Sequence, residues 1–297
     1  MGGTKSKMDC TDLSFSIIVP AFNEEESIVD VIDRIKESWR SCGYPYEIII
    51  VDDGSSDKTF QLAVSQEVRV LQHTSNRGYG ASLKTGIKES KYDWILITDA
   101  DGTYPIDQTP LFLKFIPEYD MVVGARTGDV VKIPVLRRLP KWILNKLANY
   151  LTGVKIPDIN SGLRIMKKDS VEHFMKILPD GFSFTTTITL AMLTNNMPVH
   201  FLPINYYHRE GKSKIRPIRD MLNFLQLIIR TILYFEPLKV FVPVAFALFT
   251  AAFLVLFLSY MYTEKVMDIT TVVLFVAGIQ ILAIGMIADL IDKRWKL

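Results

Sequence analysis

The stretch Trp94-Ile95-Leu96-Ile97-Thr98-Asp99-Ala100-Asp101 joins a short apolar run to two carboxylates one residue apart. Such a run is typical of a buried strand, and polar residues just after a strand lie where open α/β sheets bind ligands. Carboxylate oxygens suit Mg²⁺ or Mn²⁺, and these ions usually arrive with phosphates. Turns rich in Asp are also common, so this stretch alone leaves open a metal site and a solvated turn.

Outward from this stretch, short apolar runs alternate with helix-like segments, which indicates a parallel, doubly wound α/β sheet. The expected strands are residues 15–19, 47–51, 68–71, 94–98 and 121–124, with Pro20 ending the first. The expected helices are residues 25–40, a segment from Ser56 or Asp57 through 66, and residues 79–90. After residue 124 the alternation stops.

Two later segments are amphipathic. Residues 136–151 interleave basic side chains with Trp142 and Tyr150, and residues 217–235 are rich in Leu, Ile and Phe. Basic amphipathic helices with aromatic residues are typical of a membrane surface, although a helix covering a soluble core also fits the first segment. We expect both segments to lie at the lipid interface.

The C-terminal region predicts a transmembrane hairpin. Hydrophobic residues make up 49% of the chain, and its mean hydropathy is +0.20. Two uncharged runs, about residues 240–263 and 269–288, account for the excess. At about 1.5 Å per residue the first reaches roughly 36 Å, enough for a hydrocarbon core of ~30 Å. The expected organisation is a domain over 1–215, an interface helix over 216–238 and a hairpin over 239–297.

Charge predicts the orientation of this hairpin. Arg230 and Lys239 precede the first span, Lys293, Arg294 and Lys296 follow the second, and the connecting loop has Lys265 alone. The positive-inside rule therefore puts both termini and the first domain in the cytoplasm. The two cysteines, Cys10 and Cys42, fit a reducing compartment, and a net charge of +2 gives no indication of nucleic-acid binding.

Two further strand ends carry polar motifs. Pro20-Ala21-Phe22-Asn23-Glu24-Glu25 follows the first strand, and Asp52-Asp53-Gly54-Ser55 ends the second. Backbone amides and carboxylates at these positions can hold the base and ribose of a nucleotide. Gly78 and Gly80 open the third helix, but Leu83 occupies the third glycine position of a dinucleotide fingerprint, which disfavours a Rossmann dehydrogenase.

Taken together, Val19–Glu24, Val51–Ser55 and Asp99–Asp101 resemble the motifs of family 2 glycosyltransferases with a GT-A fold. Within that family the chain is similar to dolichyl-phosphate mannose synthases and bacterial polyprenyl-phosphate glycosyltransferases. The resemblance covers roughly residues 15–214, and the hairpin is similar to the membrane anchor of the bacterial members. It implies a GT-A (Rossmann-like) domain with amphipathic interface helices and a two-helix anchor.

The resemblance also implies site residues. Asp158 to Arg164 is similar to the family signature Asp-x-x-Ser-Gly-Phe-Arg, and Arg209 to Lys214 to the signature Arg-x-x-Gly-x-Ser-Lys. The expected catalytic residues are Asp99, Asp101 and Asp158, with Asp101 and Asp99 as metal ligands. The expected nucleotide-sugar contacts are Pro20, Ala21, Asn23, Glu24, Asp53, Gly78, Ala81, Asp99, Ala100, Arg209 and Lys214. The expected acceptor-phosphate contacts are Arg126, Arg137, Arg138, Arg164 and Ser213.

One departure from the family pattern concerns the donor. The mannose synthases continue the acidic motif with Leu-Gln-His-Pro, whereas this chain has Gly102-Thr103-Tyr104-Pro105. Thr103 stands where a Gln would help to ligate the metal. This puts GDP-mannose in doubt and favours a UDP-sugar.

The resulting expectation is an inverting transfer of a sugar from a nucleotide diphosphate to polyprenyl or dolichyl phosphate, with Mg²⁺ or Mn²⁺. A phosphate monoester is mostly dianionic at neutral pH, so it needs no strong base. Asp158 is thus open to two roles, as a base or as an orienting group. Alternatives are a GDP-mannose-dependent synthase, a processive polysaccharide synthase with too few spans for a channel, and a non-catalytic membrane sensor. The hairpin also offers a surface for homo-oligomers.

Overall fold

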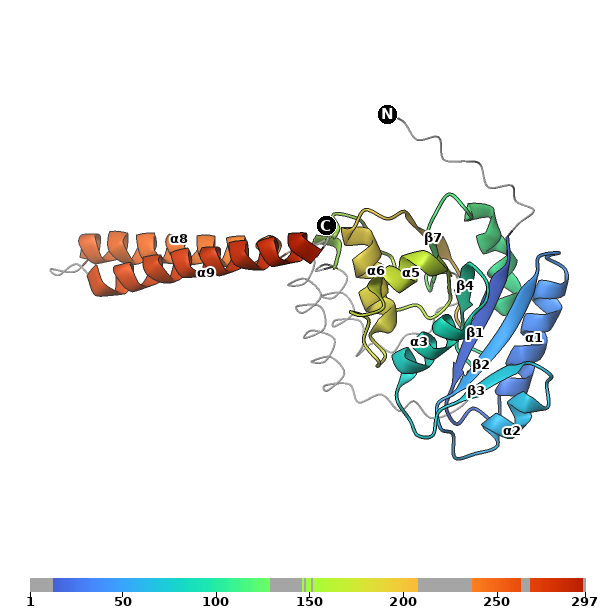
Figure 1. Ribbon diagram of the computed structural model, residues 1–297. Helices are drawn as coiled ribbons and strands as arrows, with labels where there is room; N and C mark the ends of the chain where they lie inside the picture. The colour runs from blue at the N-terminus through green and yellow to red at the C-terminus, as the bar shows by residue number, and fades with distance from the viewer. Residues whose placement is uncertain are drawn as a thin grey trace. The chain divides into compact units, whose positions relative to one another are not determined.

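The apolar runs form one seven-stranded sheet in the order β3-β2-β1-β4-β6-β5-β7 (Figure 1). Its strands are β1 (Phe15–Ala21), β2 (Tyr46–Asp52), β3 (Arg69–Gln72), β4 (Trp94–Ile97), β5 (Met121–Ala125), β6 (Arg164–Lys167) and β7 (Val199–Pro203). Every residue of β1 and β4 is buried, as expected for central strands covered on both faces. The five predicted strands are all present, and their ends differ from the prediction by at most two residues.

The structure shown in Figure 1 is a computed structural model, and it describes residues 13–128, 146, 148–150, 152–207, 237–262 and 268–295. Most of the two predicted interface segments lies outside the described residues. Five predicted site residues lie outside them as well: Arg137, Arg138, Arg209, Ser213 and Lys214.

The centre of the sheet contains a topological switch point between β1 and β4. Strand β1 is parallel to both neighbours, so that Ile18 pairs with Ile49 on one side and with Ile97 on the other. The chain runs outward from β1 through β2 to β3 and then returns to form β4 on the opposite side of β1. In open α/β sheets, the loops that leave such a switch point diverge and open a crevice for ligands.

The prediction that Pro20 ends the first strand was wrong, because β1 continues to Ala21. The Ile18 carbonyl accepts a hydrogen bond from the Thr98 amide on the β4 side, and the Ala21 carbonyl accepts one from Asp53 on the β2 side. Backbone groups alternate between sides along a strand, so the Pro20 nitrogen faces the side where β4 has already ended. A missing N–H at this position therefore breaks no ladder bond.

The five predicted strands run in one direction, and the unpredicted strand β6 makes the sheet mixed. Strand β6 runs antiparallel to β4 and β5, whereas β5 and β7 are parallel to each other. The residues that precede β6 consequently lie at the same edge as the residues that follow β1, β4 and β5. This reversal brings the Asp158–Gly162 segment to the ligand-binding edge.

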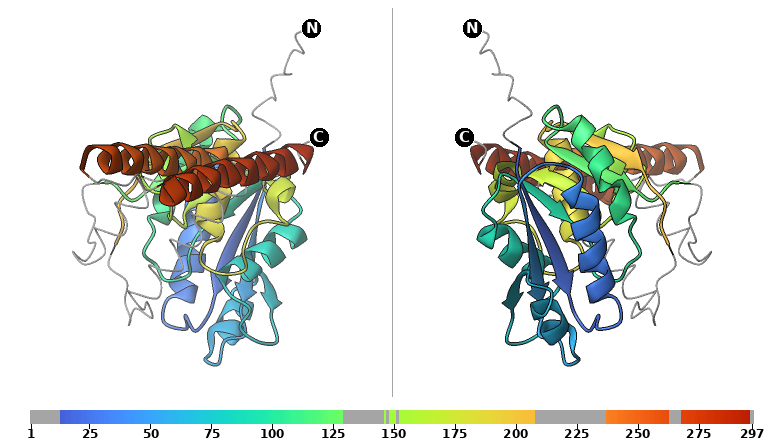
Figure 2. Two further views of the ribbon diagram at one scale, coloured as in Figure 1. Left: turned by 90° about the vertical axis from the view of Figure 1, so that its left-hand side faces the viewer. Right: turned by 90° about the vertical axis from the view of Figure 1, so that its right-hand side faces the viewer.

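Helices cover both faces of the sheet (Figures 1 and 2). Helix α1 (Ile28–Arg40) buries the predicted apolar face against one side of the sheet, next to the 3-10 helix η2 (Ile106–Phe115). Helix α3 (Tyr79–Glu89) lies on the opposite side, where Gly86 packs on Ile18. Among the described residues this unit also contains α2 (Thr59–Val64), α5 (Lys168–Phe174) and α6 (Phe184–Thr194).

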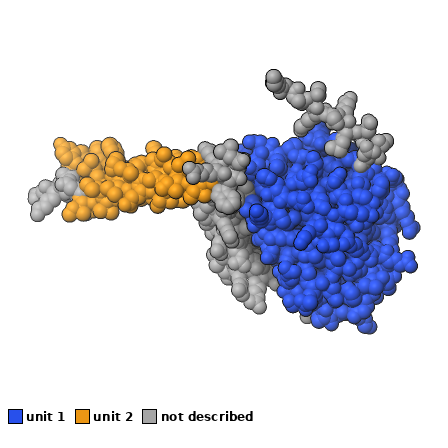
Figure 3. Space-filling model, viewed as in Figure 1, with its two compact units in different colours: residues 1–224 blue, residues 225–297 orange. Residues whose placement is uncertain are grey.

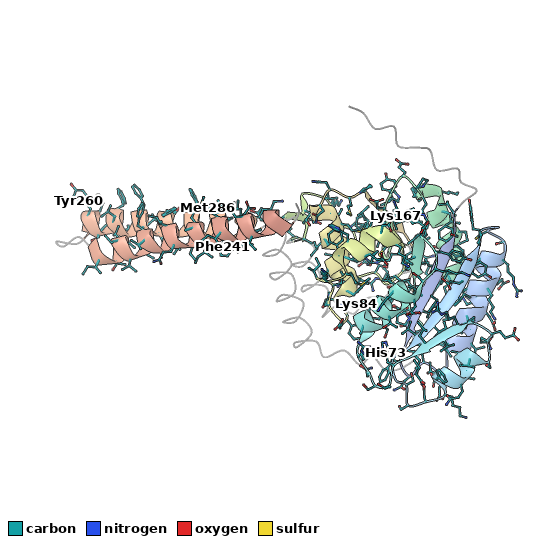
Figure 4. All side chains as sticks on the ribbon, viewed as in Figure 1. His73, Lys84, Lys167, Phe241, Tyr260 and Met286 are labelled. Atoms are coloured by element: carbon teal, nitrogen blue, oxygen red, sulfur yellow. The ribbon has the colours of Figure 1, made fainter. Side chains whose placement is uncertain are left out.

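In the C-terminal unit, residues 225–297 (Figure 3), the described residues form a pair of long apolar helices. Helix α8 (Leu238–Tyr262) and helix α9 (Asp268–Trp295) each contain a segment long and apolar enough to cross a membrane, Leu238–Tyr262 and Ile269–Ile291. Only 11% of each hydrophobic window is buried inside the protein, so these apolar side chains point outward (Figure 4). The bounds of these two segments differ by at most three residues from those of the predicted spans.

The two helices contact each other through small residues spaced by seven. On α8 the buried residues are Ala245, Ala252 and Ser259, and on α9 Gly278 and Gly285 pack under Phe249 and Phe241. A seven-residue repeat keeps one face of each helix against its partner, as in left-handed helix pairs. The small residues let the two backbones approach closely.

Candidate active site

Six segments far apart in the sequence meet at the carboxyl edge of the sheet. Five of them follow strands, and the sixth precedes the antiparallel strand β6. In chain order they begin at Phe22 after β1, Asp53 after β2, His73 after β3, Thr98 after β4, Arg126 after β5 and Asp158 before β6. Ser27, at the start of α1, donates a hydrogen bond of 2.7 Å to the Ala100 carbonyl and so joins the two loops that flank the switch point.

Asp99 is held in place from two sides. The Tyr79 hydroxyl, at the start of α3, donates to Asp99 Oδ1 at 2.9 Å. Gly162 packs directly on the same carboxylate, because a Cβ at this position would lie 2.8 and 2.9 Å from its two oxygens. The Gly162 amide in turn donates to the Tyr104 hydroxyl at 2.6 Å. The Asp99 carboxylate therefore has a defined position in the crevice.

Asp101 is oriented by its own turn. Its Oδ1 accepts hydrogen bonds from the Thr103 hydroxyl at 2.6 Å and from the Thr103 amide at 3.2 Å. Thr103 is completely buried, and its carbonyl accepts a hydrogen bond from the Tyr207 amide at 3.0 Å. Thr103 consequently supports the Asp101 carboxylate from behind and is not placed as a metal ligand.

The residues present fit a divalent cation. Asp99 and Asp101 are half-buried and supply hard oxygen donors at the switch point. Within the described part of the chain, no group of three or more His, Cys, Asp or Glu side chains is arranged to hold a metal. A site with few protein ligands suits Mg²⁺ or Mn²⁺, which keep several waters and bind substrate phosphates.

The predicted nucleotide contacts after β1 form a tight pair of loops with the residues after β2. Asn23 has a positive φ of 54°, and its Oδ1 accepts a hydrogen bond from the Ser56 amide at 2.8 Å. The Asn23 amide donates to Ser55 Oγ, and the Glu24 amide donates to Thr59 Oγ1, each at 2.9 Å. Pro20 and Ala21 lie in the buried end of β1 beneath these loops.

Asp53 is buried, and its carboxylate holds the next loop in place. Asp53 Oδ1 accepts from the Arg77 amide at 2.9 Å and Oδ2 from the Gly78 amide at 2.8 Å. His73, labelled in Figure 4, contacts Asp53 Oδ1 through Nδ1 at 2.7 Å and Thr85 Oγ1 through Nε2 at 2.9 Å. Sequence reasoning missed His73, although its position directly after β3 was a usable signal.

Gly78 and Ala81, two predicted nucleotide contacts, lie under a loop from a distant part of the chain. The Ala81 amide donates to the Asp180 carbonyl at 2.9 Å, and Lys84 pairs with the Asp180 carboxylate at 2.7 Å (Figure 4). A Cβ on Gly78 would lie 2.6 Å from the same carbonyl. These contacts give both residues a structural partner, so the geometry does not support direct contact with a nucleotide.

Arg126 and Asp158 form an ion pair in which Asp158 is completely buried and Arg126 is half-buried. Asp158 Oδ2 accepts from Arg126 Nε at 2.6 Å, and Oδ1 accepts from Arg126 Nη2 at 3.0 Å. The Tyr206 ring lies 5.1 Å from the guanidinium carbon and packs on Tyr104 with ring centroids 5.3 Å apart. Burial disfavours the charged form, but Tyr104 and Asp158 outweigh it and keep the pKa of Arg126 well above its ordinary value. This cation is therefore fixed and permanent.

The placement of Arg164 does not support the predicted contact with the acceptor phosphate. Its side chain is completely buried, and burial lowers its pKa to about 10. Its two terminal nitrogens donate to the Ser161 carbonyl, the Thr185 carbonyl and Thr189 Oγ1. A guanidinium enclosed in this way reaches neighbouring protein groups and not the crevice.

Comparison with known proteins agrees with this arrangement. The model of the family "Glycosyl transferase family 2" matches residues 16–175, which is 160 of the 297 residues. The "GtrB C-terminal hairpin" model matches residues 236–293, which contain α8 and nearly all of α9.

Curated relatives resemble the chain over most of its length. Glycosyltransferase AglJ of Haloferax volcanii is 29% identical over 93% of this chain and 92% of the relative. Undecaprenyl-phosphate 4-deoxy-4-formamido-L-arabinose transferase of Pseudomonas paraeruginosa is 27% identical over 95% and 86%. Dodecaprenyl-phosphate galacturonate synthase of Rhizobium johnstonii is 26% identical over 95% and 89%.

Solved structures share the fold. Glucosyl-3-phosphoglycerate synthase from Mycobacterium tuberculosis, in complex with Mn²⁺ and UDP-glucose, superposes with a TM-score of 0.56 at 21% identity. The match covers 74% of this chain and 78% of that one. The fold is GT-A, with a mixed α/β sheet and a C-terminal pair of apolar helices. The chain is a glycosyltransferase that belongs to glycosyl transferase family 2.

Proposed function

We propose that the protein is a membrane-bound inverting glycosyltransferase that moves a sugar from a UDP-sugar to a polyprenyl or dolichyl phosphate at the cytoplasmic leaflet. The observation that carries this proposal is the arrangement of charge at one edge of the sheet. The carboxylates of Asp99 and Asp101 lie after β4, and the fixed Arg126 cation follows β5. The two carboxylates suit a metal-bound diphosphate, and the Arg126 cation suits an acceptor phosphate.

The donor half rests on the loops around the switch point. The Asn23–Glu24 loop, the Asp53 loop and the Ala100 backbone surround the crevice where α/β sheets hold nucleotides. Asp101, with Asp99, would hold a divalent cation, and that ion would supply positive charge to the departing diphosphate. The glucosyl-3-phosphoglycerate synthase that shares this fold binds Mn²⁺ and UDP-glucose, which supports a uridine donor and a metal.

The acceptor half rests on Arg126. Arginine binds phosphate through paired hydrogen bonds, and the bidentate contact with Asp158 fixes the plane of the Arg126 guanidinium. Asp158 is completely buried and occupied by this contact, which favours an orienting role over that of a base. On the family signature we assign Ser213 to the acceptor, and Arg209 and Lys214 to the donor phosphates; Arg137 and Arg138 are assigned to the acceptor as further cations of the chain.

The lipid nature of the acceptor rests on the hairpin and on the relatives. A chain with two helices long enough to span a bilayer holds its reaction at the surface where a polyprenyl phosphate lies. The named substrates of the Pseudomonas and Rhizobium relatives are undecaprenyl and dodecaprenyl phosphates. The Lys and Arg residues that flank the hairpin support a cytoplasmic orientation.

A mannosyl donor is the second candidate, because undecaprenyl-phosphate mannosyltransferase of Micrococcus luteus is 27% identical over 67% of this chain. Thr103 argues against GDP-mannose. It stands where the mannose synthases have a Gln that helps to hold the metal, yet here it is buried and bonded to Asp101.

A donor panel tests the proposal. The purified full chain in detergent is incubated with Mn²⁺, undecaprenyl phosphate and labelled UDP-glucose, UDP-GlcNAc, UDP-glucuronate or GDP-mannose. We expect label in the lipid fraction from one uridine donor, dependent on added lipid phosphate. Asp101→Asn should abolish the transfer, whereas Asp107→Asn, an exposed carboxylate on η2, should not. Transfer from GDP-mannose alone overturns the uridine assignment, and no lipid-linked product from any donor overturns the acceptor class.

A further inference from the structure

Arg164 is a buried cation whose hydrogen bonds go to neutral groups. Its side chain is completely buried, and Nη1 donates to the Thr185 carbonyl at 3.0 Å and to Thr189 Oγ1 at 2.9 Å. Nη2 donates to the Ser161 carbonyl. No ion pair joins Arg164 to a carboxylate in the described part of the chain, and Nε has no hydrogen-bond partner there. Burying a charge that contacts only neutral groups costs folding free energy. A role of Arg164 that needs a buried guanidinium would account for this cost.

The contacts of Arg164 join two elements that are separate in the sequence. One arm of the guanidinium reaches helix α6, and the other reaches the segment from Asp158 to Gly162, here called the edge segment. A second contact joins the same two elements, because Thr186 Oγ1 on α6 hydrogen-bonds to Asn160 Oδ1. Helix α6 is almost entirely buried and thus provides a fixed support.

The edge segment carries two groups of the candidate active site. At its start, Asp158 holds the Arg126 guanidinium through two hydrogen bonds. At its end, Gly162 packs on the Asp99 carboxylate without room for a Cβ. A shift of this segment by an ångström would displace both the acceptor-side cation and a donor-side carboxylate, and such misplacements are costly to catalysis.

We propose that Arg164 is a positioning residue that ties the edge segment to α6 from inside the core and thereby sets the positions of Arg126 and Asp99. The effect of Arg164 on the acceptor rests on the proposed function, in which Arg126 binds the acceptor phosphate. The tie itself is a property of the fold and is measurable without any substrate.

The chemistry of the side chain fits this role. A planar guanidinium presents donors in a fixed fork, so one side chain can bond to two elements in different directions. A lysine at this position has a single ammonium group and cannot reproduce both arms. Although burial lowers the pKa of Arg164 to about 10, the group stays protonated at neutral pH and keeps its full set of donors.

Two threonines on α6 provide a matched test. Thr189 Oγ1 donates to the Thr185 carbonyl at 2.8 Å and also accepts from Arg164, whereas Thr187 Oγ1 donates to the Ser183 carbonyl at 3.0 Å without touching Arg164. Both are buried in the same helix. Thr189→Val and Thr187→Val therefore remove the same kind of intrahelical bond, and only the first removes a contact to Arg164.

The first measurement is hydrogen exchange of the full chain in detergent, followed at amides of residues 158–162. Loss of one hydrogen bond should speed exchange about fivefold in Thr189→Val and leave Thr187→Val like the wild type. Equal exchange in the two variants overturns the proposal. Because this comparison uses only the two threonine variants, it tests the proposal even if Arg164→Met fails to fold.

The second measurement separates kcat from KM with the donor and acceptor found by the panel. Thr189→Val should lower kcat/KM for the lipid phosphate about fivefold, with UDP affinity unchanged. Arg164→Met should lower it about a hundredfold, and Arg164→Lys should restore part of that loss. Wild-type kcat/KM in Arg164→Met overturns the proposal. If the wild type transfers no sugar to lipid phosphate, the proposed function fails, and the exchange measurement still decides on the tie.

Discussion

The Tyr79 hydroxyl donates a 2.9 Å hydrogen bond to Asp99 Oδ1 and so joins the first residue of α3 to the acidic motif after β4. Burial, and then the negative charge of Asp99, raise the pKa of Tyr79 well above its ordinary value. The phenol therefore remains a neutral donor at every pH at which the enzyme is assayed. Phe182, which is 79% exposed, stacks on the other side of the Tyr79 ring with an interplanar angle of 14°.

Replacement of Tyr79 by phenylalanine should lower kcat about tenfold, because the Asp99 carboxylate loses a hydrogen bond to a charged acceptor. Because the pKa of Tyr79 is raised, the wild-type hydroxyl stays protonated throughout the assay range. The ratio of wild-type to variant kcat should therefore stay constant from about pH 6 to about pH 9. Rate–pH profiles of both enzymes test this. A factor that shrinks toward alkaline pH would show that Tyr79 ionises in the assay range. Tyr44→Phe, at a ring that packs on Phe15, is the control.

Thr103→Val should weaken Mn²⁺ binding by about tenfold to a hundredfold, because residues that orient a metal ligand commonly contribute that much. The valine keeps the shape of Thr103 but removes the hydroxyl that bonds to Asp101 Oδ1. Thr103→Ser retains the hydroxyl and should stay near the wild type. Activity titrated with Mn²⁺ after removal of metal by EDTA gives the comparison. Equal Mn²⁺ dependence in the valine and serine variants would contradict the orienting role.

Asp158→Asn should lower kcat/KM for the acceptor without removing its dependence on pH. We expect a loss of about tenfold to a hundredfold, since an amide cannot hold the Arg126 guanidinium through two charge-assisted bonds. The acidic limb of the profile should persist near the second pKa of a phosphate monoester, about 6, because the nucleophile is already anionic. Disappearance of that limb in the variant would instead identify Asp158 as the base.

Gly162→Ala should reduce activity strongly. A Cβ at this position would lie 2.8 Å from Asp99 Oδ1, so either the carboxylate or the edge segment has to move. Gly181→Ala is the matched control, because a Cβ there would meet no atom within 4 Å. Steady-state kinetics and thermal unfolding of both variants separate loss of geometry from loss of fold. Full activity in Gly162→Ala would show that Asp99 need not occupy this position.

In the hairpin, Gly278→Val should destabilise the packing of α8 against α9. An added Cβ would lie 2.5 Å from Phe249 Cε1, and overpacking of this kind typically costs about 1–3 kcal/mol. Val272→Leu, on an exposed part of α9, should have no such effect. The thermal unfolding of the two variants in detergent is compared by far-ultraviolet circular dichroism. An unchanged midpoint in Gly278→Val would mean that the helices pack differently.

The first half of the fold was predictable because its signals are local. The strands β1 to β5 are apolar runs bounded by turn residues, and the buried face of α1 follows a helical period. Strand β6 was missed, since it is only four residues long and both begins and ends with a basic residue. Its direction depends on pairing with β4 and β5, and no local pattern encodes that.

The sequence predicted where several residues of the candidate site lie, but it did not predict which side chains they contact. The motifs placed Asp99 and Asp101 at the ligand-binding edge of the sheet, where the structure has them; Arg126 and Asp158 were predicted site residues whose place in the sheet was not predicted. The partners of Gly78 and Ala81, and those of Arg164 on α6, come from residues 180–189, which no motif linked to the site. The role of Tyr79 was hidden for a similar reason, because its hydroxyl reaches Asp99 across twenty residues of chain.

The reversed strand β6 also has a consequence for how such enzymes diversify. Loops that follow the parallel strands β1, β2 and β4 are open to insertion and substitution, as surface connections generally are. The edge segment is different, since a core arginine, a buried helix and the Asp99 carboxylate all contact it, and its own Asp158 holds Arg126. Under the proposed function, substitutions in those loops would change the recognition of sugar and nucleotide, while the edge segment would keep the Arg126 guanidinium in one position.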